Sequence, residues 1–127
     1  GTLLEVLQAL ALAGVDADVT ANRITTLPRF TDATRWISIE NIPVFSGKIS
    51  ILHQSAGSST FANKSGKELI WRAMFPGNVA MISGMDAKHT NDELGNSFSY
   101  LDIVCKPGET KTAEACKYKL EEDEKFD

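Results

Sequence analysis

The sequence predicts an α+β fold in which one N-terminal amphipathic helix packs on a largely antiparallel β-sheet, with a C-terminal loop closed by a disulfide. Three observations lead to this prediction: helical periodicity over residues 1–24, polar and apolar residues that alternate from Trp36 onward, and one pair of cysteines, Cys105 and Cys116. With 127 residues, 43% of them hydrophobic, the chain is expected to form a single domain, residues 1–127.

The helix is expected over residues 1–27. At 100° per residue, its polar side chains fall within one arc of about 160°, and leucine, valine, alanine and isoleucine side chains fall on the opposite side. No proline occurs before Pro28, which is expected to end the helix. The polar arc consists of Glu5, Gln8, Asp16, Asp18, Asn22 and Arg23.

The sheet is expected over residues 36–120, because short alternating segments are separated by turn signals. Trp36 and Trp71 are expected to pack in the core. An acidic tail, residues 121–127, is expected to follow the sheet. The predicted strands are residues 36–39, 48–53, 68–75, 78–83, 98–105 and an edge strand at 117–120, with polar loops at 55–60 and 84–96.

Cys105 and Cys116 are the only cysteines, and ten residues opening with a Pro-Gly turn separate them. A disulfide closing this loop would stabilise the fold by about 3 kcal/mol and would indicate an extracytoplasmic protein, at the cell surface or in the periplasm. The alternative is a pair of free thiols. The spacing does not suit zinc, and only His53 and His89 could complete a site, so no metal and no cofactor is predicted.

No group of residues predicts catalysis, and the chain is expected not to be an enzyme. His53 is expected to be a surface residue at a strand end, with a general base as the alternative. The formal net charge of -4 argues against nucleic-acid binding, and Asn63, with Lys64 and Ser65, forms a glycosylation sequon. A polar loop, with Ca²⁺ binding as its alternative, contains Asp86, His89, Asp92 and Glu93.

Residues 2–6, Thr-Leu-Leu-Glu-Val, resemble the start of mature type IV pilins and type II secretion pseudopilins. The resemblance implies a structural subunit of a pilus-like filament that serves assembly, adhesion or secretion. It also implies that Glu5 pairs with the N-terminal amine of a neighbouring subunit, because a buried unpaired carboxylate is costly. The other residues implied in subunit assembly are Leu3, Leu4, Val6, Leu7 and Leu10.

The chain departs from that family at Gly1 and in its apolar run, residues 9–15, which is shorter than the roughly 20 residues needed to span a bilayer. We therefore hypothesise that Gln8, Asp16 and Asp18 replace apolar residues of a native anchor helix, and we expect membrane contact only if the native helix is apolar. The alternative function is a small secreted or periplasmic binding or inhibitor domain, such as an effector or immunity protein, without catalysis.

Overall fold

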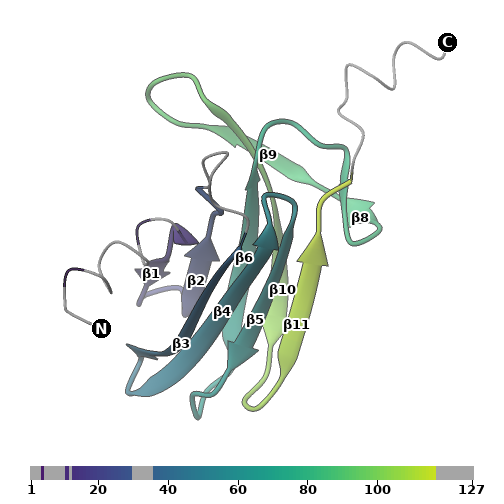
Figure 1. Ribbon diagram of the computed structural model, residues 1–127. Helices are drawn as coiled ribbons and strands as arrows, with labels where there is room; N and C mark the ends of the chain where they lie inside the picture. The colour runs from purple at the N-terminus through teal and green to yellow at the C-terminus, as the bar shows by residue number, and fades with distance from the viewer. Residues whose placement is uncertain (1–3, 5–10, 12, 30–35, 117–127) are drawn as a thin grey trace, which may run out of the picture.

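The computed structural model describes residues 4, 11, 13–29 and 36–116, and all the elements with defined bounds in these residues are β-strands (Figure 1). The fold is therefore all-β, and the expected α+β class is wrong. The strands are β1 (Asp16–Asp18), β2 (Arg23–Thr26), β3 (Ile37–Val44), β4 (Gly47–Ser55), β5 (Ser58–Asn63), β6 (Leu69–Pro76), β7 (Met81–Ile82), β8 (Met85–Asp86), β9 (Lys88–Asn91), β10 (Ser97–Cys105) and β11 (Thr110–Glu114).

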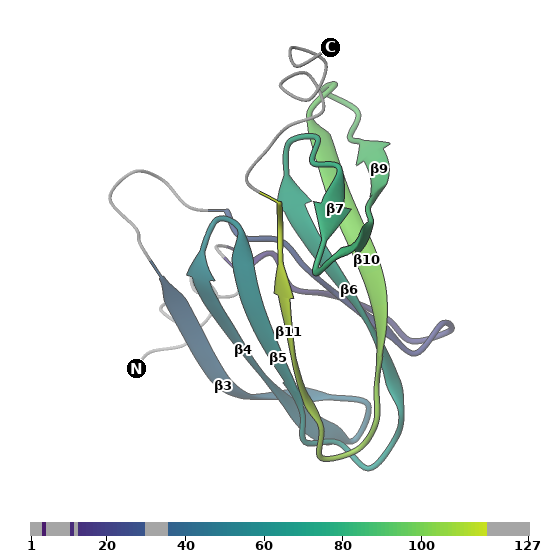
Figure 2. The ribbon, with the colours of Figure 1, turned by 90° about the vertical axis from the view of Figure 1, so that its right-hand side faces the viewer.

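Two sheets lie face to face as a β-sandwich (Figures 1 and 2). Sheet A has the order β1-β2-β6-β10-β9, and sheet B has the order β11-β5-β4-β3. All neighbours pair antiparallel except β2 and β6, which are parallel. The chain passes from sheet A to sheet B through the turn between β10 and β11, and β7 and β8 form a separate small hairpin.

The core lies between the sheets, because alternate side chains of each central strand point inward. In β6 the buried residues alternate along the strand, and Trp71 is fully buried. The Trp71 ring stacks on Phe61 of sheet B at 5.3 Å between centroids, and its indole N–H donates to Thr26 Oγ1 at 2.9 Å. Trp71 is thus a core residue as predicted, whereas Trp36 is 64% exposed and the prediction for it is wrong.

The second half of the expected helix is a β-hairpin formed by β1 and β2. Asp18 accepts hydrogen bonds from Thr20 N–H, Thr20 Oγ1 and Ala21 N–H, and Asn22 has a φ of 50°, so local polar contacts favour a turn here. The β-branched Ile24 faces the core. The expected pilin-type helix is therefore wrong for residues 16–26, which form a hairpin. Asp18 stabilises the turn of this hairpin, a role that does not fit the hypothesis that it replaces an apolar anchor residue.

The remaining residues of the proposed filament contact are Leu3, Glu5, Val6, Leu7 and Leu10, which, like Gln8, lie outside the described residues. Leu4 is described and is 64% exposed. Because residues 16–26 form a β-hairpin where the family has a helix, the pilin resemblance is contradicted. Within the described residues, the structure contains no helix long and apolar enough to cross a membrane.

The expected strands at residues 36–39, 48–53, 68–75 and 98–105 are confirmed by β3, β4, β6 and β10. The expected loops are wrong in part, because β5 begins at Ser58 and the region 84–96 contains β8 and β9. Of residues 78–83, only Met81–Ile82 form a strand. The edge strand expected at 117–120 and the tail at 121–127 lie outside the described residues.

The expected disulfide is absent between Cys105 and Cys116. Cys105 ends β10 and its Sγ lies 3.4 Å from Glu109 O, whereas Cys116 follows the far end of β11 and its N–H donates to Met81 O. The extended β11 alone spans about 13 Å, well beyond the roughly 7 Å between Cα atoms that a disulfide tolerates. The segment expected as a disulfide loop is thus an edge strand of sheet B.

Asn63 is the last residue of β5, the strand that ends at the bottom of Figure 1, and it closes this end of the sandwich. Its side chain is fully buried, and Nδ2 donates to Lys67 O at 2.8 Å and to Cys105 O at 2.9 Å. Its Oδ1 accepts from Ser65 N–H at 3.0 Å and Ser65 Oγ at 2.6 Å. Three of these four bonds are with backbone groups, and the fourth is with the Ser65 hydroxyl. They hold together two connections, which we call the closed end (residues 63–69 and 105–109), so this asparagine is a structural residue and not an accessible sequon.

Candidate functional site

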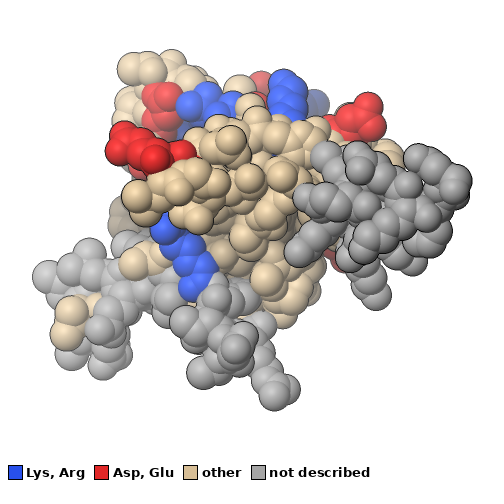
Figure 3. All heavy atoms as spheres, turned by 90° about the horizontal axis from the view of Figure 1, so that it is seen from above, with Lys and Arg blue, Asp and Glu red and all other residues tan. Residues whose placement is uncertain are grey.

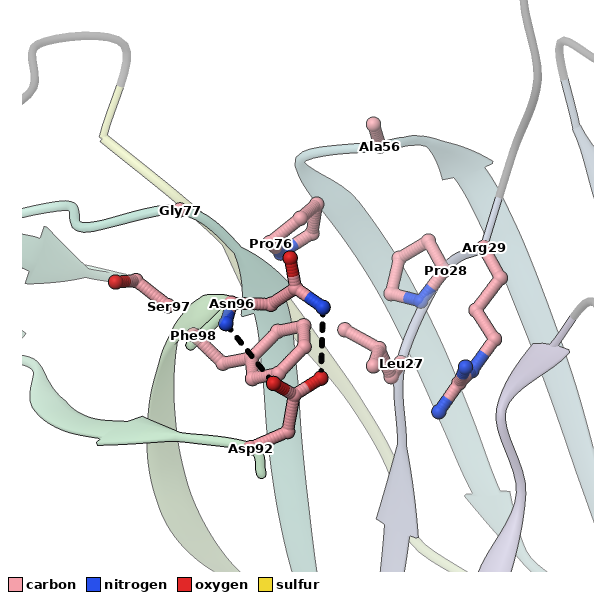
Figure 4. Close-up of a pocket in the computed structure, with 10 residues that line it drawn as sticks. All are labelled: Leu27, Pro28, Arg29, Ala56, Pro76, Gly77, Asp92, Asn96, Ser97 and Phe98. Atoms are coloured by element: carbon pink, nitrogen blue, oxygen red, sulfur yellow. Dashed lines mark hydrogen bonds between the residues drawn. The ribbon is translucent and has the colours of Figure 1, made fainter. Parts of the chain in front are cut away.

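A pocket of ≈460 Å³ lies at the opposite end of the sandwich, which we call the open end. A volume of this size lies in the range of roughly 300–1,000 Å³ that is usual for ligand sites. The pocket is assembled from the segment after β2, the β4–β5 turn, the end of β6, and the β9–β10 loop with the start of β10 (Figure 4). Its lining residues are Leu27, Pro28, Arg29, Ala56, Pro76, Gly77, Asp92, Asn96, Ser97 and Phe98.

The pocket has an apolar floor. It consists of Leu27, Pro28, Pro76 and Phe98. Phe98 is half-buried and lies opposite Pro76 in the β6–β10 ladder and opposite Thr90 in the β9–β10 ladder. Leu27 and Pro28 face these residues from the segment after β2 (Figure 4). Because Pro28 and Pro76 have no backbone N–H, this floor presents few backbone hydrogen-bond donors to a ligand. Seen from this end, uncharged residues occupy most of the centre of the described surface (Figure 3).

Asp92 shapes the loop that forms the opposite side of the pocket. Its Oδ1 accepts from Leu94 N–H and Asn96 N–H, both at 2.9 Å, and its Oδ2 accepts from Asn96 Nδ2 at 2.8 Å (Figure 4). These hydrogen bonds, with that from the Asn96 side chain first, hold the pKa of Asp92 below its ordinary value, and the charge of Arg29 contributes further. The carboxylate is thus ionised and largely occupied by its own loop.

Arg29 supplies the positive charge of the pocket. It is exposed, and its side chain extends along Pro28 and Leu27 on the side of the pocket opposite Asp92 (Figure 4). No hydrogen bond or ion pair joins its guanidinium to a described residue. It also lines a second hollow of ≈340 Å³ beside Gly14, Val15 and Asp16. Its N–H donors are therefore available to a ligand from either hollow.

Ala13 and Gly14 hold the Leu27 side of the pocket in place. The carbonyl of Ala13 accepts from Leu27 N–H at 3.1 Å and lies 2.9 Å from His53 Nε2. Gly14 has a φ of +59°, and a Cβ added there would lie only 2.2 Å from Leu27 O. A glycine is thus required by both the backbone angle and the space. These contacts join the segment before β1 to Leu27, the first residue that lines the pocket.

His53 is a core residue and not the surface residue expected from the sequence. It is fully buried in β4, with Nδ1 at 2.6 Å from Ser59 Oγ and Nε2 donating to Ala13 O. Burial lowers the pKa of His53, while the hydrogen bond to Ala13 opposes this shift. The alternative of a general base is not supported, because the ring faces no pocket and both nitrogens have protein partners.

The side chains weighed as Ca²⁺ ligands do not converge. Asp86 lies in β8, His89 lies in β9, where its Nε2 is 2.7 Å from Val79 O, and Asp92 is occupied by its own loop. Across the part of the chain that the structure describes, no group of three or more His, Cys, Asp or Glu side chains is placed to hold a metal ion. The solvated polar loop expected for Glu93 agrees with its exposed position.

The pocket was not predicted from the sequence. A connection between the expected strands 68–75 and 78–83 and a polar loop at 84–96 were both expected, but nothing in the sequence indicated that they meet residues 27–29 in space. Comparison with known proteins adds no assignment: no protein-family model, no curated protein and no solved structure matches this chain.

Proposed function

We propose that this chain is a non-catalytic binding domain that holds its ligand in the pocket at the open end. The observation that carries the proposal is the combination of an apolar floor at Leu27 and Phe98 with the Arg29 guanidinium, which forms no hydrogen bond or ion pair with a described residue. Ligand pockets are usually apolar with a few polar groups that fix orientation. This agrees with the alternative function expected from the sequence, a small binding or inhibitor domain.

Binding is favoured over catalysis by the chemistry of the lining. The pocket includes Ser97 but neither histidine nor cysteine, and a serine needs an adjacent base to act as a nucleophile. His53 is buried away from it, and His89 is bound to Val79 O. The polar groups at hand, Arg29 and Asn96, are suited to hydrogen bonding a ligand.

The proposed binding function does not require an extracytoplasmic location. The extracytoplasmic location was expected because Cys105 and Cys116 could form a disulfide. That disulfide is absent, so the location stays a prediction. The same holds for the expected lack of nucleic-acid binding, which depends on the net charge of -4. Self-assembly through an N-terminal helix is not proposed, because the second half of that helix is a hairpin.

An NMR titration of ¹⁵N-labelled protein with N-acetyl-leucinamide tests the site. This probe is neutral and carries one apolar side chain, so it examines the apolar floor without relying on charge. We expect saturable shift changes at the amides of Gly77, Asn96 and Phe98, with a dissociation constant in the millimolar range or weaker, as small ligands give. Shift changes that are absent, or that gather away from this pocket, would contradict the proposal.

Two variants make the test specific. Ala56 is exposed on the β4–β5 turn at the rim, so Ala56→Trp places a large ring across the pocket and should abolish the shift changes. Thr110→Trp adds the same ring at an exposed position of β11, near the closed end, and should leave them intact. Equal binding by both variants would place the site elsewhere.

A further inference from the structure

Arg29 differs from the other arginines that the structure describes. Arg23 forms an ion pair with Asp18 at 3.1 Å, and Arg72 pairs with Asp102 through two bonds at 2.8 and 3.0 Å. Among the described residues, no carboxylate lies within ion-pair distance of Arg29. A guanidinium carries five N–H donors in a planar fork that matches a carboxylate. The pocket therefore presents, beside an apolar floor, a guanidinium fork that no described carboxylate occupies.

The nearby Asp92 does not use this fork. Its two oxygens accept three hydrogen bonds from Leu94 and Asn96, so most of its acceptor capacity is taken within its own loop. The charge of Arg29 reaches Asp92, because it contributes to the lowered pKa of that carboxyl, yet no hydrogen bond joins the two. Arg29 is thus held near a shielded negative charge and keeps its donors for another partner.

Asn96 adds a second unused group. Its Nδ2 donates to Asp92, whereas its Oδ1 accepts no hydrogen bond from a described residue. The pocket then offers a forked cation on one side, an amide acceptor on the other and an apolar floor between them (Figure 4). A ligand that matches all three has a carboxylate, an amide N–H and an apolar side chain on neighbouring atoms. The C-terminal residue of a peptide carries these three groups close together.

We propose that the pocket binds the C-terminal residue of a peptide, with its α-carboxylate on Arg29, its amide N–H on Asn96 Oδ1 and its apolar side chain against Leu27 and Phe98. This inference rests on the proposed function, since it names the ligand of the same pocket. The exposed rim at Ala56 and Asp92 leaves room for the rest of the peptide to continue into solvent. Charge-assisted bonds from a guanidinium are the strongest contacts that such a site offers.

The test compares N-acetyl-leucine with N-acetyl-leucinamide in the same NMR titration. The two differ only in the carboxylate, and we expect the acid to bind at least about tenfold more tightly, as is usual for hydrogen bonds to charged groups. Equal affinity would overturn the carboxylate assignment while leaving the pocket as a binding site. Failure of both probes to shift pocket amides would instead contradict the proposed function itself.

Substitution of Arg29 identifies the cation. Arg29→Gln should remove the preference for the acid and leave amide binding unchanged, and Arg29→Lys should restore part of it, because lysine keeps the charge but not the fork. Lys48→Gln removes an exposed charge from the start of β4 and serves as the matched control, with the preference retained. An acid preference that persists in Arg29→Gln would overturn the assignment.

A longer probe separates a peptide from a free acylated amino acid. N-acetyl-Ala-Ala-Leu should bind more tightly than N-acetyl-leucine if the ligand is a peptide terminus, because the added residues contact the rim. Tighter binding of the single residue would overturn the peptide assignment in favour of a small acylated amino acid. In either case acid binding should weaken as salt is raised, since the guanidinium is exposed.

Discussion

The two ends of the sandwich use an asparagine for opposite purposes. At the closed end, Asn63 is fully buried, and its four side-chain hydrogen bonds are all with groups of the protein itself, three of them backbone groups. At the open end, Asn96 is exposed and its Oδ1 accepts no hydrogen bond from a described residue, and the same pocket contains Arg29, whose guanidinium has no described hydrogen-bond or ion-pair partner. The comparison separates polar groups that stabilise the fold from polar groups that are available to a ligand.

The difference follows from how each end is connected. At the closed end the turn of residues 106–109 lies against the start of the 63–69 connection, where Asn63 N–H donates to Glu109 O and Gly108 N–H donates to Asn63 O. At the open end the lining comes from connections that leave a hollow of ≈460 Å³ between them. Buried backbone groups need partners, so the closed end is expected to be intolerant of polar substitution and the open end tolerant of it.

The largest expected effect is at the closed end. Asn63→Ala removes four hydrogen bonds and leaves the Lys67 and Cys105 carbonyls without this donor, so we expect it to lower the free energy of unfolding by about 3 kcal/mol. Chemical denaturation of the variant and the wild type measures this loss.

The matched variant at the open end is Asn96→Ala, which should cost much less because Asn96 is exposed. Equal losses in the two variants would remove the distinction between the ends. Ser65→Ala should lie between them, since it removes one partner of Asn63 Oδ1 and leaves the two carbonyl contacts intact.

A smaller loss is expected at the structural part of the open end. Gly14→Ala requires an alanine at a φ of +59° and places its Cβ against Leu27 O, so we expect a loss of about 2 kcal/mol. Gly84→Ala is the control, because Gly84 has a φ of +77° but no atom within 4 Å of an added Cβ. Thermal unfolding should show a larger decrease in Tm for Gly14→Ala, and equal decreases would mean that the Leu27 contact adds nothing to backbone strain.

The strands of the core could be predicted from the sequence because their burial has period two. Leu69, Trp71 and Ala73 alternate with Ile70, Arg72 and Met74, and the structure buries the first set in β6. The helix was wrong because the polar spacing around Asp16, Asp18 and Asn22 suits a helix face and also a turn. Three hydrogen bonds to Asp18 decide in favour of the turn, and such bonds are not visible in a periodicity.

The pocket could not be predicted from the sequence for a different reason. Its walls come from segments as far apart as Leu27 and Phe98, and only the sheet order, with β2 beside β6 and β6 beside β10, brings them together. The sequence marks Ala56 and Asn96 as loop residues, but it does not say which segments meet in space. Likewise, His53 looked like a strand-end residue, and its burial depends on Ala13, which is distant in the sequence.

His53 provides a pH-dependent test of the structural part of the open end. Burial lowers the pKa of His53 below the ordinary value of 6.5. Just below pH 6.5, His53 is therefore protonated in the unfolded chain but still neutral in the folded chain. Its contribution to stability is therefore complete above pH 6.5 and is lost as the pH falls below that value, by at most about 1.4 kcal/mol per pH unit. Denaturation midpoints measured from pH 7.5 to 5 should show this slope.

The matched variant is His53→Gln, which keeps a polar side chain in β4 and removes the titration. Its stability should be lower at pH 7.5 and nearly independent of pH down to pH 5. The pKa of Asp102 is lowered mainly by its hydrogen bond with Arg72. Asp102 therefore changes stability only below its ordinary pKa of 3.8, outside the range of pH 5 to 7.5 that tests His53. An unchanged slope in His53→Gln would assign the pH dependence to another group.

The smallest expected effect is on stability at Arg29. Since its guanidinium forms no hydrogen bond or ion pair with a described residue, Arg29→Gln should change the free energy of unfolding by less than about 0.5 kcal/mol. Arg72→Gln is the matched control, because it breaks the paired bonds to Asp102 on a partly exposed sheet face and should cost about 1 kcal/mol. A stable Arg29→Gln variant that has lost its preference for N-acetyl-leucine would place the residue among the groups available to a ligand. A loss as large as that of Arg72→Gln would instead make Arg29 a structural residue, and the open end would then resemble the closed end.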